Sequence, residues 1–148
     1  MTRACALTGH RNLGEDFNCA ALEREILYLI ESGVKVFYCG MAHGFDLAAA
    51  ECVLSHSEQG AELVACVPCP EQGRKYCAVD KLRYERILEN CKEKIIISPR
   101  YERGCMLKRD RFMVESCEVV LAYLRTKRGG TYYTVEYALA QGKKVIYI

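Results

Sequence analysis

The amino-acid sequence predicts one doubly wound α/β domain, in which a mainly parallel sheet lies between two layers of helices. Two observations lead to this prediction. Mainly apolar short runs alternate with stretches of about 10–15 residues whose apolar positions recur at helical spacing, a pattern typical of parallel strands covered on both faces. A length of 148 residues also suits one domain with a substantial core, so we expect residues 1–148 to form a single unit.

The first half of the chain is expected to contain three strands and two helices. The first strand is the apolar run Ala4–Leu7. The first helix extends from Asp16 to Ser32, because apolar residues return every three or four positions until a serine–glycine pair ends it. The second strand, Val34–Cys39, leads through a glycine-rich loop to a helix from Asp46 to about His56. The third strand, Glu62–Val67, stops at two prolines, which cannot continue a central strand.

The second half continues this alternation with three more helices and three more strands. A polar loop separates it from the third strand, and no long linker, low-complexity tract or repeat interrupts it. In chain order the expected elements are a helix over Val79–Glu89, a strand over Lys94–Ile97, a helix over Cys105–Glu115, a strand over Val119–Leu124, a helix over Val135–Gln141 and a strand over Lys144–Ile148.

The composition is that of an ordinary globular protein, with 51% hydrophobic and 27% charged residues and a net charge of +2. Basic and acidic residues are well mixed, so composition gives no reason to expect a nucleic-acid partner, although it does not exclude a local basic patch. No apolar run approaches the ~20 residues that a membrane-spanning helix needs. No secretory apolar segment precedes the first strand either. We therefore expect a cytoplasmic protein without a membrane partner.

Ten cysteines are many for this length. Most of them lie inside apolar runs, where a thiol packs as a small hydrophobic group, so we predict reduced core thiols rather than a disulfide framework. Cys66 and Cys69 form a CxxC pair, but no second pair completes a zinc site. The proline at position 70 also does not resemble the helix start that activates redox thiols. We expect no bound metal and no cofactor.

Glycine-containing loops follow three of the expected strands. In parallel sheets, ligands bind outside the carboxyl ends of the strands, so these loops should lie on one rim and face a shared site. Two glycines let a backbone approach a ligand closely, because no Cβ stands in the way. The loops are Gly9-His10-Arg11, Gly40 to Gly44 and Gly129-Gly130-Thr131.

The last of these loops combines a buried strand, a glycine turn and a helix start. That arrangement aims backbone N–H groups at an anion, so Gly129 and Gly130 are predicted to cradle a phosphate. Thr131 can cap the helix and also offer its hydroxyl to a phosphate. The alternative is an ordinary tight turn in which Thr131 is only an N-cap.

The other two loops carry side chains suited to a nucleotide. Arg11 can hold a phosphate through two parallel hydrogen bonds, and His10 can donate or accept near neutral pH; the alternative is a helix lead-in with a surface arginine. Gly40 and Gly44 are interpreted as points of close ligand approach. Asp46 suits either a helix cap or a contact to ribose hydroxyls, and capping is favoured.

Arg109 and Glu136 are candidates for an acid–base or anion-holding pair across the cleft; the alternative is that both are surface charges. Arg109 shares a helix face with Met113, which directs it towards the rim of the sheet. Glu136 lies about one turn into the last helix, which limits its reach to a ligand.

Several of these motifs also match a known family, in the right order along nearly the whole chain. They are Thr8–Arg11, Gly40–Ala49, Val67-Pro68 with Gln72, Arg109–Glu115, and Gly129–Thr131 with Thr134-Val135. On them the chain resembles the SLOG superfamily of Rossmann-like nucleotide-binding proteins, and within it the YpsA-like group. The resemblance implies a Rossmann-like three-layer sandwich, a nucleotide or nucleotide-derived ligand such as a signal, and a homodimer. Together with the loops it predicts ligand contacts from Gly9, His10, Arg11, Gly40, Gly44, Asp46, Arg109, Gly129, Gly130, Thr131 and Thr134.

The same motifs leave two alternative functions open. The second block resembles the matching loop of the DNA-processing protein DprA, which implies a DNA-binding module; the near-neutral charge argues against it. The last two blocks resemble the LOG-type phosphoribohydrolases, which implies cleavage of the N-glycosidic bond of a nucleoside monophosphate. Arg109 falls on their arginine, but Thr134 stands where they keep a glutamate, and that glutamate would stabilise the charge developing on the ribose. Glu136 is a displaced substitute for it.

Overall fold

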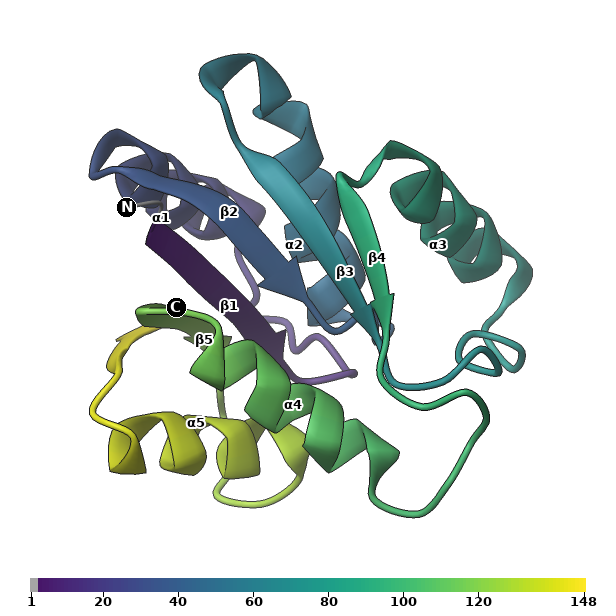
Figure 1. Cartoon of the computed structure of the whole chain (residues 1–148). Helices are drawn as coiled ribbons and strands as arrows, with labels where there is room; N and C mark the ends of the chain where they lie inside the picture. Colours follow the sequence, from purple (N-terminus) through teal and green to yellow (C-terminus); the bar gives the residue numbers. More distant parts are fainter. Residues whose placement is uncertain (1–2) are drawn as a thin grey trace.

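The computed structural model describes residues 3–148, so the first two residues of the predicted domain lie outside it. The described chain forms three layers, with a sheet between two groups of helices (Figure 1). This is the Rossmann-like α/β sandwich predicted from the alternating apolar runs.

The sheet has six strands, all parallel, in the order β4-β3-β2-β1-β5-β6. The strands are β1 (Arg3–Gly9), β2 (Val34–Cys39), β3 (Glu62–Val67), β4 (Glu93–Ile96), β5 (Val119–Tyr123) and β6 (Lys144–Tyr147). The chain winds outwards from β1 to one edge and then returns to add β5 on the other side, so the winding direction changes between β1 and β5. Leu7 pairs with both Cys39 and Leu121, which brings the carboxyl ends of β1, β2 and β5 to the same level.

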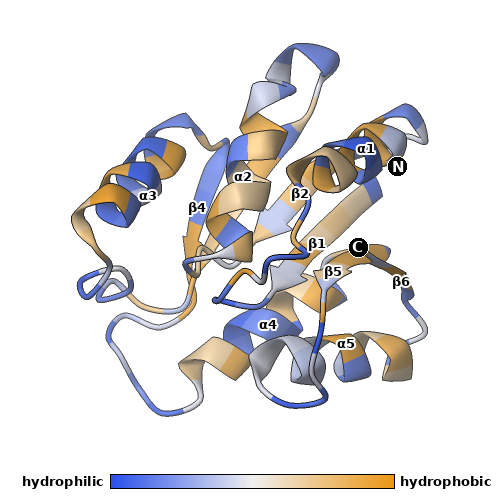
Figure 2. Ribbon diagram, turned by 180° about the vertical axis from the view of Figure 1, so that it is seen from behind, coloured by the Kyte–Doolittle hydropathy of each residue, from blue (hydrophilic) through white to orange (hydrophobic). Residues whose placement is uncertain are grey.

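Five α-helices connect these strands, and a short 3₁₀ turn, Ser57–Gln59, precedes β3. They are α1 (Cys19–Glu31), α2 (Phe45–Ser55), α3 (Ala78–Asn90), α4 (Cys105–Glu115) and α5 (Gly130–Ala140). Helices α4 and α5 lie on the near face of the sheet in Figure 1, and Figure 2 shows α1, α2 and α3 on the other face. Helix α3 buries only Ile87 and is largely hydrophilic.

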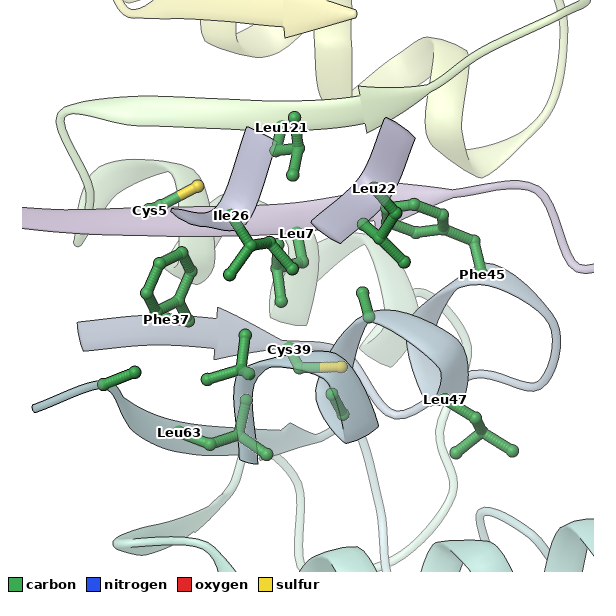
Figure 3. Packing of buried hydrophobic residues seen from close by; sticks show 14 of the residues in the cluster. Cys5, Leu7, Leu22, Ile26, Phe37, Cys39, Phe45, Leu47, Leu63 and Leu121 are labelled. Atoms are coloured by element: carbon green, nitrogen blue, oxygen red, sulfur yellow. The ribbon is translucent and has the colours of Figure 1, made fainter. Parts of the chain in front are cut away.

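The main core lies between the sheet and the helices α1 and α2 (Figure 3). Leu22, Ile26 and Leu29 are the buried residues of α1, as the helical spacing predicted. Burying one such side chain stabilises a fold by about 1.5–3 kcal/mol. Cys5 and Cys39 are free thiols in this core, where they pack as small apolar groups. The predicted use of cysteine as a core residue is therefore confirmed at these positions.

Two predicted helix starts were wrong. Helix α1 begins at Cys19 rather than Asp16, because Asn18 provides the cap: its Oδ1 accepts from the N–H groups of Ala20 at 2.9 Å and Ala21 at 3.1 Å. Helix α5 begins at Gly130, five residues earlier than expected. Its first-turn threonine, at position 131, is consequently not the N-cap.

Within residues 3–148, no helix combines the length and the apolar character that crossing a membrane requires.

Candidate functional site

A cavity of about 920 Å³ opens at the carboxyl ends of β1, β2 and β5, where the winding direction of the sheet changes. Doubly wound sheets bind ligands at this position, because the loops after neighbouring strands separate there. Nine of the predicted site residues line the cavity: Gly9, His10, Arg11, Gly40, Asp46, Arg109, Gly130, Thr131 and Thr134. Gly44, Gly129 and Glu136 are not among its lining residues.

The start of α5 forms one wall of the cavity. Gly129 occupies the N-cap position with φ of 91°, and its lack of a side chain leaves the helix without a side-chain cap. No acidic residue lies in the first turn of α5, so its first N–H groups have no charged partner within the helix. The Asp110 carboxylate of α4 lies nearby, with Oδ2 4.0 Å from the position that a Cβ on Gly130 would take. Thr134 donates its hydroxyl to the carbonyl of Gly130 at 2.7 Å, which holds the side chain within the helix.

Arg109 lies in α4 and is buried, with only 6% of its surface exposed. Its Nη1 donates to the carbonyl of Gly40, and its Nε donates to Asp110 Oδ1 at 2.7 Å. Burial lowers the pKa of Arg109, but the charges of Asp110 and Asp46 outweigh this effect and raise it, so the guanidinium stays charged. The charged partner of Arg109 is therefore Asp110. Glu136, the partner considered in the sequence, is exposed on α5.

The sequence favoured Asp46 as the cap of α2, and this prediction was wrong. The helix begins after Gly44 without a side-chain cap, and Asp46 lies in its first turn. Its Oδ2 accepts from the N–H of Ala42 at 3.1 Å, whereas its Oδ1 is buried and has no hydrogen-bond partner among the described residues. Burial raises the pKa of Asp46 to about 7, against the opposing effect of Arg109. A buried carboxylate oxygen without a donor, beside an open cavity, is suited to a donor from a ligand.

The loop after β2 is held by side chains from the loop after β3 and from α4. Met41 has a φ of 63°, in the left-handed region, which costs about 1–3 kcal/mol in a residue other than glycine. Gln72 Nε2 donates to the carbonyl of Gly40 at 2.9 Å, and the Tyr76 hydroxyl donates to that of Met41 at 3.0 Å. Arg109 reaches the same Gly40 carbonyl. Three side chains thus hold the unfavourable backbone, so the cavity wall is preorganised.

Close packing explains why the first two loops contain glycine. A Cβ on Gly9 would overlap the ring of Phe45, and one on Gly40 would lie 2.8 Å from Arg109 Nη1. At Gly44, where φ is 82°, a Cβ would overlap the backbone carbonyl of Arg11. These glycines therefore allow loops and helices to pack closely around the cavity.

His10 organises the loop after β5. Its Nε2 accepts from the N–H of Arg125 at 2.7 Å and, more weakly, from that of Thr126 at 3.4 Å. Burial and then the charge of Arg125 lower the pKa of His10, which favours the neutral imidazole that these bonds require. His10 therefore positions the rim of the cavity.

A second network on this rim was not predicted from the sequence. The hydroxyl of Tyr123 accepts from the N–H of Gly14 at 3.0 Å and donates to Asp16 Oδ1 at 3.1 Å. Arg125 pairs with Asp16 and lies over the Tyr123 ring at 4.4 Å. This network ties the loop after β1 to the end of β5. Its partners are far apart in the chain, and no local motif identifies them.

The CxxC pair has none of the features of a reactive site. Burial raises the pKa of both the Cys66 and Cys69 thiols, in the Cys66 case to about 12, whereas redox and metal-binding thiols need a lowered pKa. Within residues 3–148, no group of three or more His, Cys, Asp or Glu side chains is placed to hold a metal ion.

Residues 16–147 match the sequence family YpsA, described as the YspA SLOG family. The chain belongs to this family. The membership agrees with the resemblance found in the loop motifs. A second comparison points the same way: the SLOG chain is 30% identical, over 134 residues, to UPF0398 protein BH1768 of Halalkalibacterium halodurans. That match covers 87% of the chain and 71% of the relative.

Several solved structures have a similar fold. DprA from Helicobacter pylori, whose single-stranded DNA binding mode has been described, superposes with a TM-score of 0.74 at 18% identity. DprA from Streptococcus pneumoniae superposes with a TM-score of 0.70 at 18% identity. The molybdenum cofactor carrier protein of Chlamydomonas reinhardtii superposes with a TM-score of 0.65 at 15% identity. The matches cover 98–99% of the chain in all three cases. They cover 64% of the Helicobacter structure, 50% of the Streptococcus structure and 76% of the carrier protein. The chain thus spans about half to two thirds of the DprA structures, and at these identities the likeness shows the fold alone.

Proposed function

We propose that the cavity binds a nucleotide or a nucleotide-derived small molecule, such as a signal. One observation carries the proposal: the cavity lies at the point where the winding of the sheet reverses, and an uncapped helix start opens into it. Doubly wound domains bind nucleotides at this point, with phosphate at the helix N-terminus.

The phosphate is proposed to bind the backbone N–H groups at Gly129, Gly130 and Thr131. Arg11 supplies the positive charge, because Arg109 and Arg125 already pair with aspartates, whereas Arg11 forms no ion pair within residues 3–148. Two parallel hydrogen bonds from a guanidinium suit a phosphate.

The nucleoside is proposed to contact Asp46. Its unpartnered Oδ1 can accept a hydrogen bond from a ribose hydroxyl or a base N–H group when the carboxyl is ionised, and can donate one to a ligand oxygen when it carries the proton. Arg109 acts on this contact indirectly, because it holds the neighbouring Gly40 carbonyl and its charge faces Asp46. Gly9, His10, Gly40, Gly44 and Thr134 are proposed to shape the site through the packing and hydrogen bonds described above.

Isothermal titration calorimetry with the common nucleoside mono-, di- and triphosphates tests the proposal. We expect at least one of them to bind, and Gly130→Val to weaken that binding by at least about tenfold, because the new side chain blocks approach to the helix start. A Cβ at Gly130 meets only Asp110, at 4.0 Å, so the variant should fold. Ala140→Val, at the exposed far end of the same helix, is the matched control. No binding by any nucleotide, or binding that Gly130→Val leaves unchanged, rejects the proposal.

Hydrolysis of the nucleotide is not included in this proposal. Thr134 bonds to the backbone of its own helix, and Glu136 lies outside the cavity, so the cavity offers no glutamate at the start of α5. Free base released from a nucleoside monophosphate would instead establish the hydrolase alternative.

Two further properties are proposed with this function. A cytoplasmic location suits the ten cysteines, all of which are free, because reducing compartments keep thiols unpaired. A homodimer is proposed from the family resemblance, and light scattering should give twice the chain mass of 16.8 kDa.

A further inference from the structure

A second cavity of about 550 Å³ adjoins the first. The loop after β3, residues 68–76, forms most of it, and residues from the loops after β1 and β2, ahead of α4 and in the first turn of α4 complete it. The two cavities have Arg11 and Met106 in common, so these side chains stand at their boundary. Arg11 Nη2 donates to Met106 Sδ at 3.4 Å, a weak hydrogen bond between two exposed, flexible side chains. A ligand group can displace such a contact at little cost.

The second cavity has an excess of positive charge. Arg11, Arg74 and Lys75 line it, and none of them forms an ion pair within residues 3–148. Glu71 is the one carboxylate among its lining residues, and it already accepts from the backbone N–H of Tyr101 at 2.8 Å. This cavity is therefore suited to a negatively charged or hydroxyl-rich group.

Aromatic side chains complete the second cavity. His43 and Tyr76 meet edge to face, with ring centroids 5.5 Å apart, and Tyr101 exposes 60% of its surface at the rim. Exposed aromatic rings at a site can stack on the face of a sugar or of a base. The bond between Glu71 and the Tyr101 backbone fixes this part of the rim.

Side-chain hydrogen bonds connect the loops that line the two cavities. Gln72 and Tyr76 line the second cavity, and both donate to the loop after β2, which lines the first. Tyr84 in turn donates to Gln72 Oε1 at 3.0 Å, which orients its amide. One preorganised loop therefore sets the shape of both cavities at once.

We infer that the two cavities form one bipartite site, which takes a nucleoside diphosphate with a further group on its β-phosphate. This inference rests on the proposed function. The nucleoside monophosphate part lies in the first cavity, Arg11 lies beside the bridging diphosphate, and the terminal group lies near Arg74, Lys75 and Tyr101. The boundary position of Arg11 supports this arrangement, because a diphosphate crossing from one cavity to the other must pass it.

Calorimetry with matched ligand pairs tests the inference. The pairs are AMP with ADP-ribose, GMP with GDP-mannose, and UMP with UDP-glucose. For the base that binds, we expect the diphosphate conjugate to bind at least about tenfold more tightly than the monophosphate, because it gains charge-assisted contacts in the second cavity. The double variant Arg74→Ala/Lys75→Ala should remove most of that gain and leave the affinity for the monophosphate within about twofold.

The matched control is Arg100→Ala/Arg103→Ala, which also removes two exposed positive charges but lines neither cavity. It should keep the preference for the conjugate. Equal affinity within every pair overturns the inference and leaves the proposed nucleotide site standing. Equal loss in both double variants also overturns it, because the gain would then reflect general attraction between charges. If no monophosphate and no conjugate binds, the proposed function fails together with the inference.

Discussion

Replacing Arg109 by methionine should destabilise the fold strongly, because the guanidinium is buried between Asp110 and the Gly40 carbonyl. The side chains of Arg109 and Asp110 are only 7% and 14% exposed. Removing one member of a buried ion pair costs about 3–5 kcal/mol, since the other charge is left without a partner. In a chain of this size each kcal/mol lowers the melting temperature by about 2–4 °C. We therefore expect Arg109→Met to melt about 6–20 °C below the parent protein.

Thermal unfolding followed by circular dichroism measures this change. Arg103→Met, an exposed arginine ahead of α4, should leave the melting temperature within about 1–2 °C of the parent. In Arg109→Met/Asp110→Asn the unpaired charge is gone as well, so the double variant should recover part of the loss. If Arg109→Met melts at the same temperature as Arg103→Met, the reasoning is refuted, and Arg109 would be free to bind a ligand directly.

Three further predictions follow from the loops around the cavity. Asp46 keeps its proton up to about pH 7 in the folded protein but only to about pH 3.8 in the unfolded chain, so its contribution to the free energy of unfolding falls as the pH rises between these values. The variant Asp46→Asn should reduce that fall, and urea unfolding at pH 5 and pH 8 measures it. Gly44→Ala should cost about 3 kcal/mol or more, because its Cβ meets backbone, whereas Gly60→Ala, with a similar positive φ and open space, should cost about 1 kcal/mol in the same assay. Tyr123→Phe should cost about 1 kcal/mol and speed amide hydrogen exchange at Gly14, which loses its acceptor; unchanged exchange there would contradict the role given to the hydroxyl.

The order and type of the strands and helices were predictable because each buried element repeats a simple pattern. Leu22, Ile26 and Leu29 recur at helical spacing, and β5 is buried at every position. The start of α5 was missed for a physical reason. Gly129 and Gly130 look like a helix-free turn in sequence, yet the positive φ of Gly129 turns the chain directly into the helix at Gly130.

The location of the cavity was predictable, whereas its internal contacts were not. Parallel strands bring their carboxyl ends to one rim, so loops after β1, β2 and β5 had to meet. Arg109 binds a backbone carbonyl 69 positions away, and a carbonyl has no residue type by which a sequence motif can mark it. The unpartnered oxygen of Asp46 likewise depends on burial, which only the packed structure reveals.

The hydrogen bonds to the Gly40 carbonyl bear on how the chain folds during its synthesis. It accepts from Gln72, 32 positions further along, and from Arg109, 69 positions further along. A chain emerging from the ribosome can assemble β1, β2 and β3 early, since N-terminal segments fold first during synthesis. The loop after β2 obtains its last anchor only when α4 has been made. A nascent chain that stops before α4 therefore contains β1 to β4 but lacks the arginine that completes the anchoring of this loop.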